Sequence, residues 1–204
     1  MGVREIALDG DYLLGPDDAL AAQERARQGC RQCKLCEGRS TIVFGSGNPR
    51  AELVVIGEGP GADEDAQGLP FVGRAGQLLT KMLESVQLSR DEVYITNAVK
   101  CRPPGNRNPE SDELAACRPF LDAQLGTIQP KVVLALGSVA TQALLRTKEP
   151  IGKMRGRLHP FGNAVLVPTF HPAFLLRNPG PEYRRMAWDD LKLAKREYDQ
   201  RRSR

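Results

Sequence analysis

The sequence predicts an α/β fold, built as a single three-layer α/β/α domain around a central, mainly parallel four-stranded sheet. Four apolar, β-branched runs are typical of buried strands, and helical patterns lie between them. Strands that alternate with helices form parallel sheets covered on both faces. The 204 residues suffice for one buried core, and no long low-complexity linker divides them. We therefore expect residues 1–204 to form one domain.

The expected elements follow in order along the chain. Residues 1–29 form a lead-in whose helix covers Asp18 to Gln28, with Asp17 or Asp18 as its cap. The predicted strands are "AELVVIGE" (51–58), "VYITNAV" (93–99), "KVVLALG" (131–137) and "AVLVPTF" (164–170). The predicted helices cover residues 75–86, 109–125 and 138–146, and a last amphipathic helix covers roughly residues 181–202 of the C-terminal segment 181–204.

Composition and charge exclude few functions. Hydrophobic residues make up 41% of the chain and charged residues 26%, so neither disorder nor a membrane protein is indicated. The net charge of +4 permits a polyanionic partner without requiring one. Lys and Arg stand on Pro- and Gly-rich segments in "KCRPPGNRNP", "KMRGR" and "LLRNP", where they are either phosphate contacts or solvated surface.

Targeting and membrane signals are not expected from the pattern. No stretch approaches the roughly 18 apolar residues of a membrane span. The start "MGVREIALDGDYLLGPDD" has acids where a signal peptide needs an apolar core, and Ile6 breaks the myristoylation pattern. We therefore expect a cytoplasmic protein that does not associate with membranes.

The loop after the first predicted strand, "GEGPGADEDAQGLPFVG" (57–73), is the first candidate for a ligand site. In parallel sheets ligands bind beyond the carboxyl ends of the strands. Gly57, Gly59 and Ala62 match a dinucleotide fingerprint, but the loop then continues and its acids at 63–65 would repel a pyrophosphate. The glycines instead let the backbone approach a flat, uncharged ligand, and Glu58 is expected to point into the same crevice.

Three further side chains belong to the same strand ends. Phe71 is either a core residue or a stacking platform for a planar ring. Asn97 either caps or turns the chain or reads a base, because its carboxamide matches O4 and N3–H of uracil and mismatches cytosine. His171, followed by Pro172, is either structural or a donor to a developing anion.

The five cysteines form a pattern typical of a metal centre. In a cytoplasmic chain they argue against structural disulfides. Two residues separate Cys30 from Cys33, and two separate Cys33 from Cys36, whereas Cys101 and Cys117 stand singly. This pattern suits an iron–sulfur cluster better than a zinc ribbon, with buried unreactive thiols as the alternative. Cys101 stands four residues beyond Asn97, which limits their separation to about 14 Å.

Five segments, taken in order, resemble the family 4 uracil-DNA glycosylases, the thermostable iron–sulfur members of the uracil-DNA glycosylase superfamily. They are "CRQCKLCEGRS", "GEGPGADEDAQGLPFVGRAGQLL", "VYITNAVKCRPPGNRNP", the spacing from Cys101 to Cys117, and "FHPAFLLRNP". The likeness covers residues 30 to about 179. It implies an enzyme that flips uracil out of DNA and hydrolyses its N-glycosidic bond, leaving an abasic site as the first step of base excision repair.

The resemblance also implies roles for individual residues. A 4Fe-4S cluster would be held by Cys30, Cys33, Cys101 and Cys117, while Cys36 would be a spectator because similar proteins commonly lack a cysteine there. The uracil pocket would comprise Gly57, Glu58, Gly59, Phe71, Asn97 and His171, with Glu58 and His171 catalytic. Glu64 and Asn106 would support the site. Leu175 or Leu176 would fill the vacated base stack, and Arg177 would hold a phosphate.

Two features bear on the reaction and its rivals. Gly59 stands where the better-known branch of the superfamily has a water-activating aspartate, which leaves Glu58 as the candidate. No lysine is placed as an obvious Schiff-base nucleophile, so a monofunctional enzyme is expected. The alternatives are a covalent uracil-DNA binder, whose Arg-rich insertion and histidine "KCRPPGNRNP" lacks, and an iron–sulfur module that binds nucleic acid without catalysis. We expect a monomer, associated with the nucleoid through uracil-containing DNA, with repair-protein partners that the sequence does not name.

Overall fold

The computed structural model describes residues 14–202, so the first part of the expected lead-in lies outside the described residues. Its centre is a six-stranded sheet with the order β1-β3-β2-β4-β6-β5. The four predicted strands form the middle of this sheet and run parallel. They are β2 (Leu53–Gly57), β3 (Tyr94–Asn97), β4 (Val132–Leu136) and β6 (Ala164–Thr169). The predicted α/β class with a mainly parallel sheet is confirmed.

The expected number of four strands was too low. Two antiparallel strands, β1 (Ser46–Gly47) and β5 (His159–Phe161), pair with β3 and β6 and form the two edges of the sheet. They contain two and three residues and lack the apolar runs that marked the central strands. Periodicity gives no signal over so few positions, and these strands form because an already ordered neighbour offers free backbone groups.

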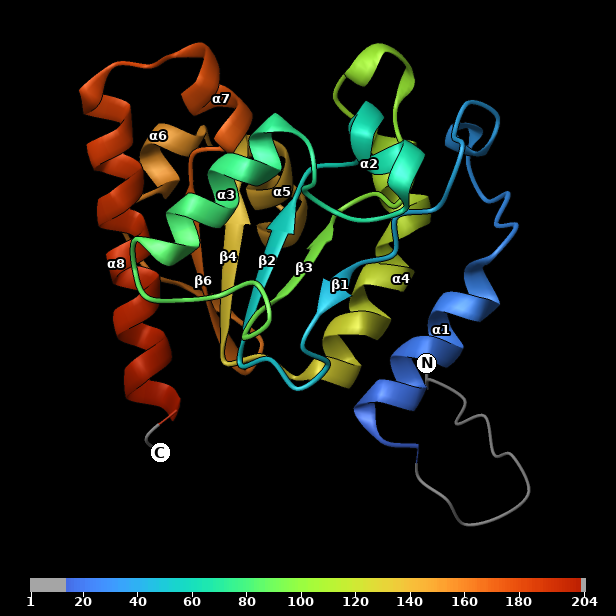
Figure 1. Cartoon of the computed structure of the whole chain (residues 1–204), viewed down its shortest axis with the longest axis horizontal. Coiled ribbons are helices and arrows are strands. Elements are labelled where there is room, and N and C mark those ends of the chain that lie inside the picture. Colours follow the sequence, from blue (N-terminus) through green and yellow to red (C-terminus); the bar gives the residue numbers. More distant parts are fainter. Residues whose placement is uncertain (1–13, 203–204) are drawn as a thin grey trace.

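Helices cover both faces of the sheet (Figure 1). Alternate residues of β2 face opposite sides, as the period of two in a strand requires. Leu53 and Val55 pack with α3 (Arg74–Glu84), α7 (Pro172–Arg177) and α8 (Pro181–Arg202). Val54 and Ile56 pack with α1 (Pro16–Arg27), α4 (Ser111–Ile128) and α5 (Gly137–Leu145). The sheet is thus buried between two helical layers, which explains why all five residues of β2 are buried.

The parallel strands direct their carboxyl ends to one end of the molecule, where α2 (Ala62–Gln67) and the 3-10 turn Pro104–Asn106 lie (Figure 1). The register places Gly57 of β2 directly beside Asn97 of β3. A short helix, α6 (Ile151–Met154), follows α5. In the described part of the chain no helix combines the length and the apolar character needed to span a membrane.

Candidate active site

The predicted pocket residues converge on a hollow at the carboxyl end of the sheet. This cavity has a volume of about 420 Å³, within the range of small-molecule sites. Eight of the residues singled out from the sequence line it: Glu58, Gly59, Glu64, Phe71, Asn97, Asn106, His171 and Arg177. The structure therefore brings together residues from β3, α2, α7, the 3-10 turn Pro104–Asn106 and the loops between these elements.

Gly57 lies behind the pocket wall and sets how closely its neighbours approach. A Cβ atom at this position would lie 2.4 Å from both the Asn97 Oδ1 atom and the Phe71 Cζ atom. Asn97 is only 1% exposed, and its Oδ1 has no hydrogen-bond partner among the described residues. A buried acceptor without a partner costs about 1 to 3 kcal/mol, so this atom is suited to a ligand that brings a donor.

Phe71 is held in an unusual backbone conformation, with a φ of 54°. Two charged side chains fix the chain around it. The Glu64 carboxylate accepts hydrogen bonds from the backbone N–H groups of Val72 and Gly73, both at 2.9 Å. The Arg90 guanidinium donates to the backbone carbonyl of Phe71 at 3.0 Å and to that of Pro70 at 2.8 Å. The ring is therefore positioned by buried polar contacts as well as by apolar packing.

The acids at 63–65 do not form the extended loop expected there, because residues 62–67 fold into α2. Glu64 also accepts from the Gly61 N–H at 3.1 Å, which satisfies a donor that precedes the helix. Asp65 is 3% exposed and accepts from the backbone N–H groups of Ser40 and Thr41. Asp63 lines the cavity. Two of the three acids thus hold the loop in place, and this explains carboxylates in a segment that begins like a nucleotide-binding loop.

His171 presents one defined tautomer to the pocket. Its Nδ1 atom accepts a hydrogen bond from the Ala173 N–H at 3.1 Å, as the cap of α7. Burial, with a smaller contribution from the positive charge of Arg177, lowers the pKa of His171 to about 4. A neutral ring that accepts at Nδ1 carries its proton on Nε2. The ring centroid lies 5.7 Å from that of Phe71, so a donor stands next to the aromatic plate.

Glu58 is partly buried at the end of β2. Burial raises its pKa, whereas the nearby Arg177 guanidinium lowers it.

The two leucines of "PAFLLRNP" differ in their exposure to solvent. Leu175 is 3% exposed and belongs to the core under α7, so it cannot insert into DNA without leaving the core. Leu176 is 38% exposed, and the sequence-based choice between the two leucines is thereby narrowed to Leu176.

Four of the five cysteines line a second cavity on the other side of the loop that follows β3. They are Cys30, Cys33, Cys101 and Cys117, and Cys36 is not among the lining residues. Two of these sulfurs accept N–H donors: the Arg39 guanidinium reaches Cys101 Sγ at 3.2 Å, and the Lys100 backbone N–H reaches Cys117 Sγ at 3.3 Å. Such donors stabilise thiolate ligands. Burial raises the pKa of Cys101 to about 11, although the Arg39 guanidinium acts in the opposite direction.

The arrangement differs from that of a single-ion site. Among the described residues no group of three His, Cys, Asp or Glu side chains is placed to hold one metal ion. A tetrahedral zinc ion at 2.3 Å from each sulfur draws its ligands to within roughly 4 Å of one another.

Several charged residues on Pro- and Gly-rich segments are structural, contrary to the interpretation that they face phosphates or solvent. Lys100 is 2% exposed and donates to Thr96 Oγ1, the Asn97 carbonyl and Gln124 Oε1. Arg155 forms a two-pronged ion pair with the fully buried Asp190. No local pattern indicates either role, since Gln124 lies 24 residues from Lys100 and Asp190 lies 35 residues from Arg155 along the chain.

Fold and site together define a class of protein: an α/β domain with a ligand-sized hollow at the carboxyl end of a mainly parallel sheet, lined by an aromatic ring, a carboxamide, an imidazole and a carboxylate. Residues 44–192 match the model of the Uracil DNA glycosylase superfamily. The chain is 46% identical over 174 residues to the Type-4 uracil-DNA glycosylase of Thermotoga maritima, a match that covers 84% of this chain and 90% of that protein.

Two further relatives are uracil-DNA glycosylases as well, one of type 4 and one of type 5. The Type-4 uracil-DNA glycosylase of Saccharolobus solfataricus is 45% identical over 175 residues, 81% of this chain and 80% of that protein. The Type-5 uracil-DNA glycosylase of Thermus thermophilus is 33% identical over 178 residues, 76% of this chain and 79% of that protein. The chain belongs to the uracil-DNA glycosylase superfamily, and within it to the type-4 uracil-DNA glycosylases.

Proposed function

We propose that the protein is a monofunctional uracil-DNA glycosylase, which flips uracil out of DNA and hydrolyses its N-glycosidic bond, leaving an abasic site for base excision repair. Membership of the family supports the reaction. One observation carries the assignment of residues: Glu58, Phe71, Asn97 and His171 line a single hollow, in which the buried Asn97 Oδ1 has no partner among the described residues. A site with an unpaired buried acceptor selects a ligand with a matching donor.

Recognition is proposed to act on the flipped base. Extrusion costs a few kcal/mol and is easiest where a U·G mismatch already weakens pairing. Leu176, exposed on α7, fills the vacated stack, and Arg177 holds a backbone phosphate. Phe71 stacks on the ring, a contact worth about 1 to 3 kcal/mol. The Asn97 carboxamide pairs with N3–H and O4 of uracil, which presents cytosine with mismatched groups.

Cleavage is proposed to depend on stabilising the departing base. The bond between the sugar carbon and the base nitrogen breaks, the sugar acquires oxocarbenium character as in glycoside hydrolysis, and the bonding electrons leave with uracil as an anion. The His171 Nε2–H and the backbone N–H groups of Glu58 and Gly59 are the proposed donors to that anion. Glu58 orients the water that adds to the sugar carbon or stabilises the sugar cation. Gly59 and the supporting residues Glu64 and Asn106 shape the wall.

A 4Fe-4S cluster is proposed for the four cysteines Cys30, Cys33, Cys101 and Cys117. The shared cavity and the N–H donors to two of the sulfurs support it. When bound, the cluster would supply a rigid cross-link between the segment after α1, the loop after β3 and α4. Residues 1–204 are proposed to act as one domain and as a monomer, in the cytoplasm and associated with the nucleoid through DNA.

The test is cleavage of an oligonucleotide with a single U·G pair, followed by alkali. Wild-type protein is expected to yield strand breaks at the uracil, and both Asn97→Ala and His171→Ala are expected to lower the single-turnover rate by at least about a hundredfold, as the loss of a preorganised donor does. Unchanged rates in both variants would remove the site assignment. A trapped covalent complex would indicate the covalent binder, and equal binding of uracil-free DNA without cleavage would indicate the non-catalytic module.

A further inference from the structure

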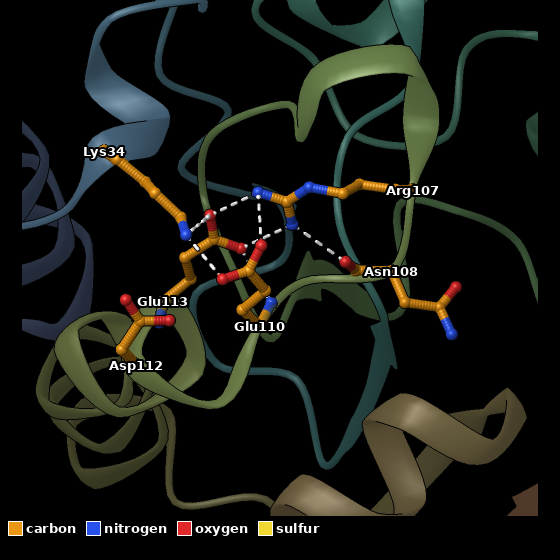
Figure 2. Close-up of polar contacts among 6 residues, drawn as sticks. All are labelled: Lys34, Arg107, Asn108, Glu110, Asp112 and Glu113. Atoms are coloured by element: carbon orange, nitrogen blue, oxygen red, sulfur yellow. Dashed lines mark hydrogen bonds and ion pairs between the residues drawn. The ribbon is translucent and has the colours of Figure 1, made fainter.

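A cluster of ion pairs lies between the cysteine-containing 3-10 turn Lys34–Cys36 and the 103–108 loop, which forms one wall of the pocket. Figure 2 shows Lys34, Arg107, Glu110 and Glu113 turned toward one another, with Arg107 also donating to the Asn108 carbonyl. Arg107 comes from the loop after β3, Glu110 and Glu113 from the start of α4, and Lys34 from the 3-10 turn Lys34–Cys36. Segments that are remote in sequence are thus joined by charge.

The pair formed by Arg107 and Glu113 is the buried part of this cluster. Arg107 donates from both terminal nitrogens to both oxygens of Glu113, at 2.8 and 2.7 Å. The Glu113 side chain is 0% exposed and that of Arg107 is 34% exposed. Glu113 also accepts from the Glu110 backbone N–H at 2.7 Å, so it caps α4 as well. Two parallel hydrogen bonds to a planar fork fix orientation as well as distance.

The remaining arm of the cluster is exposed and contributes less. Lys34 reaches Glu110 at 2.5 Å and Glu113 only at 4.0 Å, and both Lys34 and Glu110 are about half exposed. Exposed ion pairs contribute little because water screens them and two long side chains must be ordered. The buried pair therefore decides how the loop is held.

The position of the pair connects it to the pocket. Asn106, Arg107 and Asn108 all line the hollow, and Asn106 itself has a φ of 56°. The terminal nitrogens of the Arg107 guanidinium bind Glu113, Glu110 and the Asn108 carbonyl, so they are engaged within the protein. On α4, Glu113 lies one helical turn before Cys117 and hence on the same side of the helix.

We propose that Arg107 and Glu113 are positioning residues for uracil release: their buried ion pair holds the 103–108 loop against α4 and thereby fixes one wall of the pocket. This proposal rests on the proposed function. It assigns Arg107 a role different from that of a phosphate contact, because both terminal nitrogens of its guanidinium already bind partners within the protein. Displacing a pocket wall by about 1 Å is enough to cost roughly a hundredfold in rate.

The test is a double-mutant cycle on the cluster-loaded full chain with the U·G oligonucleotide. Glu113→Gln, Arg107→Met and the double variant are each expected to lower the single-turnover rate at saturating DNA by about tenfold or more, with the double variant no worse than the poorer single variant. The affinity for uracil-free DNA is expected to stay within about twofold. The double variant leaves no unpaired buried charge, so it guards against a folding defect in Arg107→Met.

Two controls and one independent measurement complete the design. Lys34→Met removes only the exposed arm and, like Lys153→Met in the exposed Lys153–Glu149 pair, is expected to change the rate by less than about twofold. Hydrogen exchange of the Asn106 and Arg107 amides, which bond to the Pro103 and Pro104 carbonyls, is expected to be about tenfold faster in Glu113→Gln.

The outcomes separate this inference from the proposed function. The positioning role would be overturned by any of three results. The reductions in rate caused by the two single changes could multiply in the double variant, or the Glu113→Gln rate could equal that of wild type. The third result is a loss of DNA affinity confined to Arg107→Met. Exchange of the loop that is unchanged in Glu113→Gln would overturn it too. If wild-type protein released no uracil, the proposed function would fall, while the exchange measurement would still report whether the pair holds the loop.

Discussion

At the scale of single residues, Phe71 shows how the site is prepared before DNA arrives. A bulky residue with a φ of 54° costs about 1 to 3 kcal/mol, and it persists only where the surroundings impose it. Here Glu64 and Arg90 bind the backbone on both sides, and Gly76 leaves room where a Cβ would lie 1.9 Å from the Phe71 carbonyl oxygen. The free energy cost of this strained conformation is therefore part of folding and does not have to be supplied when uracil binds.

The space between Asn97 and Phe71 leads to a prediction for Gly57→Ala. The added methyl group would lie 2.4 Å from both side chains and would push them apart. We expect the fold to survive, since Gly57 has an ordinary strand conformation, and the single-turnover rate on the U·G oligonucleotide to fall by about a hundredfold. Gly152→Ala on α6, where nothing lies within 4 Å, is the matched control and is expected to retain the wild-type rate. Wild-type activity in Gly57→Ala would contradict the prediction.

The charge of Arg177 leads to a prediction for pH dependence. Arg177 lowers the pKa of both Glu58 and His171, so its removal raises both pKa values. If ionised Glu58 and neutral His171 support cleavage, protonation of either then begins at a higher pH. We expect the acid limb of the single-turnover rate at saturating DNA to move to higher pH in Arg177→Met. Arg196→Met on α8 makes the same change in net charge and is expected to leave the limb in place. An unmoved limb in Arg177→Met would refute the coupling.

The positions of site residues at strand ends could be predicted from the sequence, whereas the roles of residues that depend on partners distant along the chain could not. Glu58, Asn97 and His171 follow recognisable strands, and the rule that ligands bind at carboxyl ends placed them together. Lys100 and Glu113 carry charges on or beside a Pro- and Gly-rich loop, which resembles solvated surface. Their burial depends on Gln124 and Arg107, and no local pattern reports such contacts.

At the scale of secondary structure elements, apolar run length decided what was predictable. Strands of four to six buried residues left a clear pattern, and α3, α4 and α5 lie within a few residues of their expected bounds. The six residues of α2 follow Gly and Pro and contain three acids, a composition typical of a loop. The helix forms because Glu64 binds the Gly61 N–H and Asp65 binds the 40–41 backbone, and both contacts require the folded chain.

The cysteines come from different elements, so their removal is expected to act on stability as well as on the proposed cluster. Cys33→Ser should abolish the visible absorbance of an iron–sulfur cluster and lower the free energy of unfolding by more than about 2 kcal/mol, because loss of a metal centre is among the largest single-residue effects. Cys36→Ser, whose side chain lies outside the shared cavity, should retain both. Denaturant titration followed by absorbance and circular dichroism measures the two effects. Equal loss in both variants would contradict the choice of ligands.

At the scale of the whole molecule, the two polar networks lie on opposite sides of the loop that follows β3. Lys100 binds Thr96 and Gln124 beneath the strand that carries Asn97. Arg107 binds Glu113 at the start of α4. The loop between them is therefore held at both ends by buried charge, with the four cysteines beside it. Recognition of the base and the proposed cluster thus share one structural support.

The edges of the sheet are very short. β1 has two residues and β5 has three, and β5 contains Pro160, which has no N–H to offer. A rim of this kind gives another copy of the chain almost no backbone to pair with. Edge-to-edge β-pairing between copies of the chain, a common first step toward fibrils, is therefore disfavoured at both edges.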